Sequence, residues 1–142
     1  ALLALATAFS RILTMLNAPQ VLASFLSGII SSRISFLILL NIVLLILGMF
    51  IDGAPAILIL SPLLMPIAQQ FGIDPVHLGI IMVCNLAVGL ASPPFGLNLF
   101  VASSTNGAPI IEISRKVVPF ILAFLVALIL ITFVPSISLC LV

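Results

Sequence analysis

Few side chains in this sequence could bind a ligand or carry out chemistry, because its 142 residues include only four Lys and Arg and three Asp and Glu. Asp52 is the acidic residue that lies between two long apolar runs, 34–51 and 53–73. A charged side chain at the centre of a bilayer costs about 2.5–3.5 kcal/mol on insertion scales, so such residues usually serve a function. Asp52 therefore indicates an ion or proton site if it is buried in a membrane, and marks the far membrane surface if it lies there.

A second candidate site is the sequence GLASPPFGLN at residues 89–98. Two consecutive prolines cannot continue an α-helix, because two backbone donors are missing and both rings crowd the preceding carbonyl groups. In lipid, the freed carbonyl groups need protein, water or a ligand as partners. Asn85, Gly89, Ser92 and Asn98 surround this break, and they fit either an ion or substrate site or close helix packing. We favour the ion or substrate site because several such residues converge on one broken segment.

The other reactive residue types give no support for an enzyme. The sequence has no HExxH motif and no glycine-rich phosphate loop, and nothing suggests a Ser/His/Asp set. Asp74 with Pro75 is typical of a helix start and His77 follows in the first turn, so we interpret these residues as structural caps. Cys84 and Cys140 lie in apolar runs without metal-binding spacing, and a net charge of +1 offers no basic surface for nucleic acid. We expect no enzymatic activity and no cofactor.

The elements that must hold these residues are expected in a membrane. Hydrophobic residues make up 64% of the sequence and charged residues 5%, and the mean hydropathy is +1.57. A soluble domain has about 25% charged residues, so this sequence could not cover a water-exposed surface. Charge-free stretches at 34–51, 53–73, 78–111 and 117–142 approach or exceed the roughly 20 residues that cross a bilayer as a helix. The predicted fold class is therefore an all-α integral membrane protein built of helices and broken helices.

Four segments are expected along the chain. Residues 1–33 are interpreted as the end of a membrane helix followed by an amphipathic helix in the membrane interface, with Asn17 capping its first turn. Residues 34–70 consist of two apolar arms that are joined by a short polar turn. Residues 71–111 contain a broken transmembrane helix and the loop that follows it, and residues 112–142 are expected to form a C-terminal transmembrane helix.

The two arms of residues 34–70 allow two arrangements. If both arms cross the membrane, Asp52 lies at the opposite surface, whereas in a re-entrant hairpin Asp52 lies at the buried tip. We favour the hairpin, because the tip reads DGAP and the return arm contains Pro62 and Pro66. Either arrangement returns the chain to the side that it left, so the broken helix is the next segment to cross.

Several short motifs follow one another along this region: GMFID at 48–52, SPLLMPIA at 61–68, FGIDPVHLGII at 71–81, and PPFG at 93–96 followed by LF. In this order and at this spacing, they resemble the large membrane subunit of the TRAP transporters, which are tripartite carriers that take up organic acids with Na⁺. The remaining residues fit the C-terminal end of that family. Family members are much longer, so the sequence is expected to be a fragment.

The resemblance implies a specific architecture. In that family the transport domain has two inverted repeats, and each repeat has a re-entrant hairpin followed by a broken helix. This chain is similar to the second inverted repeat of such an elevator-type secondary transporter, with residues 34–70 as the hairpin and 76–104 as the broken helix. The first repeat is missing from the sequence, so the chain is expected to need the remaining N-terminal half of the large subunit.

The resemblance also implies where ligands bind. Carried over by position, the Na⁺ ligands are expected at the hairpin tip and at the helix break: Asp52, Gly53, Ala54, Gly89, Ala91, Ser92 and Pro94. The organic anion is expected beside them, at Asn85, Pro93, Gly96 and Asn98. Ser92 stands where many family members have Thr in a TPP motif, so the hydroxyl group is kept. Na⁺ is expected as the coupling ion, and no other metal ion.

The resulting hypothesis is part of a Na⁺-coupled TRAP transporter in the bacterial inner membrane that imports a small organic anion, such as a C4-dicarboxylate or a sialic acid. The expected partners are a small membrane subunit, a periplasmic substrate-binding protein that delivers the anion, the remaining half of the large subunit and the lipid bilayer. One alternative is a membrane anchor or assembly subunit, which predicts no effect of Na⁺ on conformation. The other is a different ion-coupled carrier with similar hairpins, which needs no binding protein.

Overall fold

The computed structural model describes residues 2–29 and 32–140, and the regular elements in these ranges are all helices. They are α1 (Leu2–Met15), α2 (Ala18–Ile29), α3 (Arg33–Phe50), α4 (Gly53–Gln70), α5 (Pro75–Ala91), α6 (Leu97–Asn106), α7 (Ile110–Phe133) and α8 (Pro135–Leu139). By length and composition, α3, α4 and α7 could each cross a membrane. The predicted all-α membrane fold class is confirmed.

Polar residues set the starts of the central helices. The Oδ1 atom of Asp52 accepts a hydrogen bond from the N–H of Gly53 at 2.8 Å, and Asp74 Oδ1 accepts one from the N–H of Val76 at 2.8 Å. Such N-caps satisfy backbone donors that have no partner in the first turn. The predicted helix start at Asp74 is confirmed. α2 begins at Ala18, directly after Asn17, whose φ angle is 54°.

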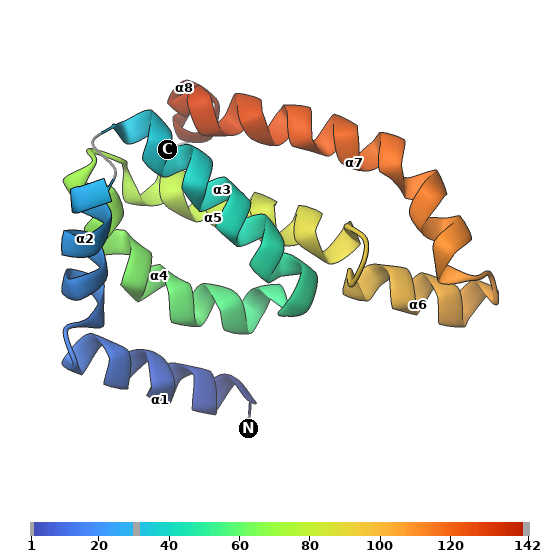
Figure 1. The fold of residues 1–142 in the computed structure, drawn as a ribbon, viewed down its shortest axis with the longest axis horizontal. Coiled ribbons are helices and arrows are strands. Elements are labelled where there is room, and N and C mark those ends of the chain that lie inside the picture. Colours follow the sequence, from blue (N-terminus) through green and yellow to red (C-terminus); the bar gives the residue numbers. More distant parts are fainter. Residues whose placement is uncertain (1, 30–31, 141–142) are drawn as a thin grey trace.

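The helices α3 and α4 form a V whose apex is the turn Ile51–Asp52 (Figure 1). Both arms pack on α5, whereas the arms make few contacts with each other. At the open end of the V the rings of Phe36 and Phe71 stack, with centroids 4.8 Å apart. Leu44 and Ile81 are completely buried in the hydrophobic core, which forms where the arms meet α5.

After α5 the helical path breaks at residues 92–96 and continues as α6. α7 then runs back along the bundle and packs on α5 and α6, and α8 folds onto α5. Figure 1 shows that the turn between α3 and α4 lies near the break, whereas α6 and the start of α7 extend beyond it. The end of α4 therefore lies near the start of α3. From there, α5 and α6 run toward the opposite end of the bundle.

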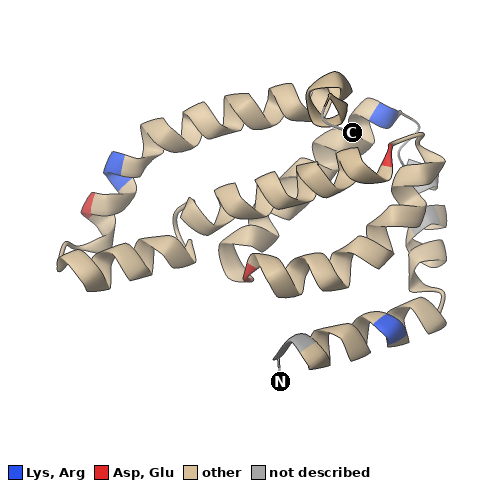
Figure 2. Ribbon diagram, turned by 180° about the vertical axis from the view of Figure 1, so that it is seen from behind, with Lys and Arg blue, Asp and Glu red and all other residues tan. Residues whose placement is uncertain are grey.

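Few charged residues occur along the helices (Figure 2). The acidic residues stand at helix starts, with Asp52 and Asp74 as caps and Glu112 in the first turn of α7. On the exposed surface of α7, Lys116 Nζ lies 2.9 Å from Glu112 Oε1. Beyond their first turns, the long helices therefore present mainly apolar side chains, as a bilayer requires.

Candidate functional site

The turn between α3 and α4 forms the first half of the candidate site. α3 ends at Phe50, and the N–H of Ile51 donates to the carbonyl oxygen of Leu47 at 2.9 Å. α4 begins at Gly53, directly after the exposed cap residue Asp52. One helix therefore presents its C-terminal carbonyl groups at this turn, and the next helix presents its N-terminal N–H groups.

The break between α5 and α6 forms the second half. Ser92 is buried there, and its N–H donates to the carbonyl oxygen of Gly89 at 2.9 Å while its hydroxyl donates to that of Val88 at 2.7 Å. The N–H of Gly96 donates to the Ser92 carbonyl oxygen at 2.9 Å. A Cβ atom at Gly96 would lie 2.6 Å from the Leu90 carbonyl oxygen, so this tight turn requires glycine. The break is thus a folded turn built around Ser92.

The hairpin turn and the helix break are close neighbours. Near the end of α3, Gly48 meets Gly89 of α5 so closely that a Cβ atom at Gly89 would lie 2.7 Å from Gly48 Cα. Beyond this contact, the rings of Phe50 and Phe95 lie with centroids 5.0 Å apart and planes tilted by 34°. Small residues permit such close backbone contacts between membrane helices. The structure therefore brings together the two segments that the sequence singled out.

Four helix ends set the local charge where the hairpin turn meets the helix break. The C-terminal ends of α3 and α5 carry carbonyl groups with partial negative charge, which suit a cation, and the N-terminal ends of α4 and α6 suit an anion. Asp52 adds one carboxylate. Among the residues that the structure describes, no group of three or more His, Cys, Asp or Glu could hold a metal ion.

The predicted site residues differ in exposure. Of the predicted Na⁺ ligands, Asp52, Ala54 and Pro94 are exposed, Gly53 and Ala91 are partly buried, and Gly89 and Ser92 are buried. Of the predicted anion-binding residues, Asn98 is exposed, Pro93 is partly buried, and Asn85 and Gly96 are buried. All of them except Asn85 belong to the hairpin turn, the break or the adjoining helix ends.

Asn85 lies further from the break, in a polar cluster that joins α3, α5 and α7. Its Nδ2 atom donates to Asn41 Oδ1 at 2.9 Å and to the Ile81 carbonyl oxygen at 2.8 Å. Thr132 Oγ1 donates to the same Asn41 oxygen at 3.2 Å, and Asn41 Nδ2 donates to the Leu37 carbonyl oxygen at 2.7 Å. Within the described chain, Asn85 Oδ1 is buried without a hydrogen-bond partner. These bonds give Asn85 a role in helix packing, which is the alternative that the sequence left open.

His77 is buried, and its ring connects three helices. Its Nδ1 atom lies 2.9 Å from Ser138 Oγ of α8, and its Nε2 atom lies 3.2 Å from the carbonyl oxygen of Thr132 in α7. The structural interpretation of His77 is therefore confirmed, but its predicted role as a helix cap is wrong. The reason is that α8, which lies within the residues 112–142 expected to form one C-terminal helix, folds back onto α5.

Sequence reasoning missed several residues that shape the site. Gly48 and Phe50 stand in the motif GMFID, and Phe95 stands in PPFG, but neither motif by itself predicts that the two meet. Asn41 did carry a usable signal, because an amide within a long apolar helix usually needs a hydrogen-bond partner on a neighbouring helix.

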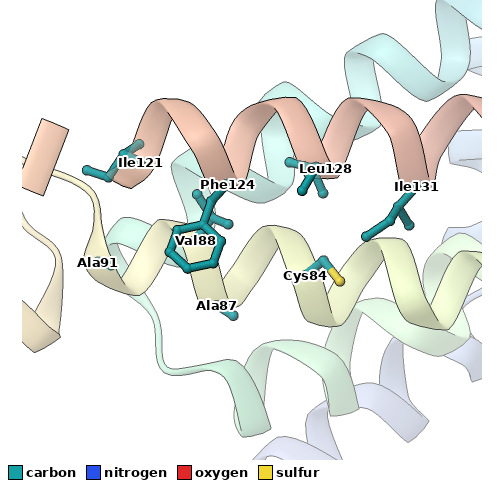
Figure 3. A pocket seen from close by; sticks show the side chains of 9 residues that line it. Cys84, Ala87, Val88, Ala91, Ile121, Phe124, Leu128 and Ile131 are labelled. Atoms are coloured by element: carbon teal, nitrogen blue, oxygen red, sulfur yellow. The ribbon is translucent and has the colours of Figure 1, made fainter. Parts of the chain in front are cut away.

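A separate cavity of about 240 Å³ lies between α5 and α7 (Figure 3). Its lining is almost wholly apolar and includes Cys84, Val88, Phe124 and Leu128, with Ala91 at the end near the break. Such a lining offers no polar group that could orient an ion or an organic anion. Cys84 is a free thiol within this apolar lining, as its sequence context predicted.

The fold and the site define a multi-pass helical membrane protein in which a hairpin turn packs against a broken helix. The chain belongs to the family described as "Tripartite ATP-independent periplasmic transporter, DctM component", which matches residues 1–137. The resemblance to the large membrane subunit of TRAP transporters is thereby confirmed.

Individual relatives agree with this family. The chain is 46% identical over 140 residues to the C4-dicarboxylate TRAP transporter large permease protein DctM of Pseudomonas aeruginosa, covering 99% of this chain and 33% of the relative. It is 44% identical over 136 residues to the isethionate TRAP transporter permease protein DctMQ of Oleidesulfovibrio alaskensis, covering 96% and 21%. It is 36% identical over 133 residues to the sialic acid TRAP transporter large permease protein SiaM of Vibrio cholerae, covering 94% and 31%.

The chain spans a third or less of the length of these curated relatives. All three are named as transporter permeases, which agrees with the expectation of a transport protein rather than an enzyme.

Proposed function

We propose that this chain forms the second half of the transport domain in the large permease subunit of a Na⁺-coupled TRAP transporter. The complete transporter imports a small organic anion, such as a C4-dicarboxylate or a sialic acid, across the inner membrane of a bacterium. The observation that carries the proposal is the meeting of four helix ends where the Ile51–Asp52 turn packs against the break at residues 92–96.

In this proposal Na⁺ binds to carbonyl groups at the C-terminal ends of α3 and α5. Broken helices of secondary carriers hold Na⁺ with unwound carbonyl groups in this way, and they direct helix N-termini toward anionic substrates. The hydroxyl group of Ser92 and the carboxylate of Asp52 lie on the two segments that would share the ion. The organic anion binds beside it at the start of α6, where Asn98 is exposed. The amide of Asn85 already has helix partners, so its proposed contribution to binding is indirect.

The V of α3 and α4 is proposed to be a re-entrant hairpin. Each arm has 18 residues, about 27 Å of helix, so length alone would allow either arm to cross a membrane. However, the turn lies beside the helix break, and α6 extends beyond both (Figure 1). If the break lies at mid-depth, Asp52 lies there too, where a carboxylate is tolerated only in contact with protein, water or an ion.

Transport itself is proposed to follow an elevator mechanism. Na⁺ orders the hairpin turn and the break, the anion binds, and the loaded domain slides across the membrane against a fixed scaffold. The proposed partners are the rest of the large subunit, a small membrane subunit and a periplasmic binding protein that delivers the anion. The relatives are named for different organic anions, which supports a shared ion-binding framework in this segment and a choice of anion made largely elsewhere.

The test is uptake into proteoliposomes that contain the complete membrane complex, with and without Na⁺ and a purified binding protein, against a panel of organic anions. Uptake that requires both Na⁺ and the binding protein is the expected result, and it would also name the substrate. Uptake with Na⁺ alone would keep the carrier class but exclude the tripartite mode. A folded complex without uptake under any condition would favour a membrane anchor.

A further inference from the structure

The rings of Phe50 and Phe95 are in contact where the hairpin turn meets the helix break. Their centroids lie 5.0 Å apart, and 60% of Phe50 and 50% of Phe95 remain exposed. Neither residue belongs to the predicted Na⁺ or anion sets. We infer that the two rings are positioning residues, which hold the hairpin turn against the break and thereby set the affinity of the Na⁺ site. The inference rests on the proposed function.

The places of the two rings in the chain suit this role. Phe50 is the last residue of α3, directly before the hairpin turn, and Phe95 lies inside the break. In the part of the chain that the structure describes, no hydrogen bond or ion pair joins the turn to the break. The ring pair is therefore a direct side-chain contact between the two loops, in addition to the backbone contact of Gly48 with Gly89.

The expected effect follows from the strength of such a pair. Aromatic pairs in tilted or offset geometry contribute a factor of about two to twelve to an equilibrium constant beyond their buried area. An ion that takes ligands from two loops binds only when both are in place, so the apparent dissociation constant rises as the competent fraction falls. Loss of the pair is thus expected to raise the Na⁺ concentration for half-maximal uptake by up to about twelvefold, with little change in the maximal rate.

The experiment is a Na⁺ titration of uptake by the complete transporter in proteoliposomes. The variants are Phe50→Ala, Phe95→Ala, the double variant, and Phe50→Tyr with Phe95→Tyr, which keep the rings. Phe120→Ala is the matched control, because this ring is 67% exposed on α7 and makes no ring contact in the described chain. If the alanine variants fail to assemble, Phe50→Leu and Phe95→Leu, which fill the space without an aromatic ring, serve the same test.

The expected outcome is a raised half-maximal Na⁺ concentration in each single alanine variant. The double variant is expected to have the same half-maximal concentration as the single variants, because either change removes the whole contact. The tyrosine variants and Phe120→Ala should behave like the wild type. If the wild type depends on Na⁺ but the double variant has an unchanged half-maximal concentration, the inference is overturned and the proposed function stands. A folded wild-type transporter without Na⁺ dependence would overturn both.

Discussion

Replacing Gly89 by alanine tests whether the close contact between α3 and α5 holds the site together. The added Cβ atom would lie 2.7 Å from the Cα and carbonyl carbon atoms of Gly48, and 2.9 Å from the carbonyl oxygen of Leu45. Carbon atoms in contact are normally about 3.5–4.0 Å apart, so α3 must move locally by roughly 1 Å. All three neighbouring atoms belong to the backbone, so no side-chain rotation can relieve the clash.

The expected loss of stability can be worked from two opposing effects. Overpacking typically costs about 1–3 kcal/mol, and alanine within a helix recovers about 0.5–1 kcal/mol relative to glycine. The net loss in the free energy of unfolding is therefore at most about 2.5 kcal/mol and centred on about 1 kcal/mol. Gly79→Ala is the matched control, because it lies on the same helix and an added Cβ atom there meets nothing within 4 Å. That variant is expected to be unchanged or up to about 1 kcal/mol more stable.

The assay is unfolding of the complete transporter in detergent, combined with a Na⁺ titration of uptake in proteoliposomes. Gly89→Ala is expected to melt at a lower temperature than Gly79→Ala, and to need more Na⁺ because its break is displaced from the hairpin turn. Equal melting temperatures and equal Na⁺ dependence of the two variants would show that the close contact of Gly89 with α3 does not hold the site together.

Three further changes test other contacts of the structure. Asn41→Leu removes the acceptor of two hydrogen bonds in the polar cluster of α3, α5 and α7. The free energy of unfolding, measured in detergent, is expected to fall by about 1–2 kcal/mol. An unchanged free energy of unfolding would contradict a role of the cluster in helix packing. Asp74→Ala removes the N-cap of α5 and is expected to cost about 1 kcal/mol by the same measurement, without changing the Na⁺ dependence of uptake. His77→Leu removes the polar contact with Ser138 of α8, so limited proteolysis is expected to cut that helix faster than in the wild type, and an equal rate would count against the contact.

Local chemistry explains what could be predicted from the sequence. A double proline forces a break in the interior of a helix, because both rings and both missing donors act within one turn. Asp74 followed by Pro75 sets a helix start by capping and by a fixed φ angle. The apolar composition requires a membrane whatever the helices pack against. These features depend on neighbours in the sequence, so the structure agrees with them closely.

The contacts that could not be predicted join residues far apart in the chain. Asn41 and Asn85 are 44 residues apart, and His77 and Ser138 are 61 residues apart. Helical periodicity reports which face of one helix is apolar, but it does not determine which helix lies opposite. Such pairings determine that α3 and α4 pack on α5 more than on each other. They also determine that α8 folds back onto α5. The Phe50–Phe95 contact at the site has the same origin.

A Na⁺ titration of uptake by the complete transporter shows directly whether the hairpin turn and the helix break bind Na⁺ together. The variants are Asp52→Ala and Pro94→Ala, with Asp74→Ala as the control. Asp52 and Asp74 are a matched pair, since each is an exposed N-cap that accepts a backbone hydrogen bond at 2.8 Å, but only Asp52 lies at the proposed site. If the two segments bind Na⁺ together, Na⁺ dependence is expected to be weaker in Asp52→Ala and Pro94→Ala and to equal that of the wild type in Asp74→Ala. Unchanged Na⁺ dependence in both site variants would contradict it.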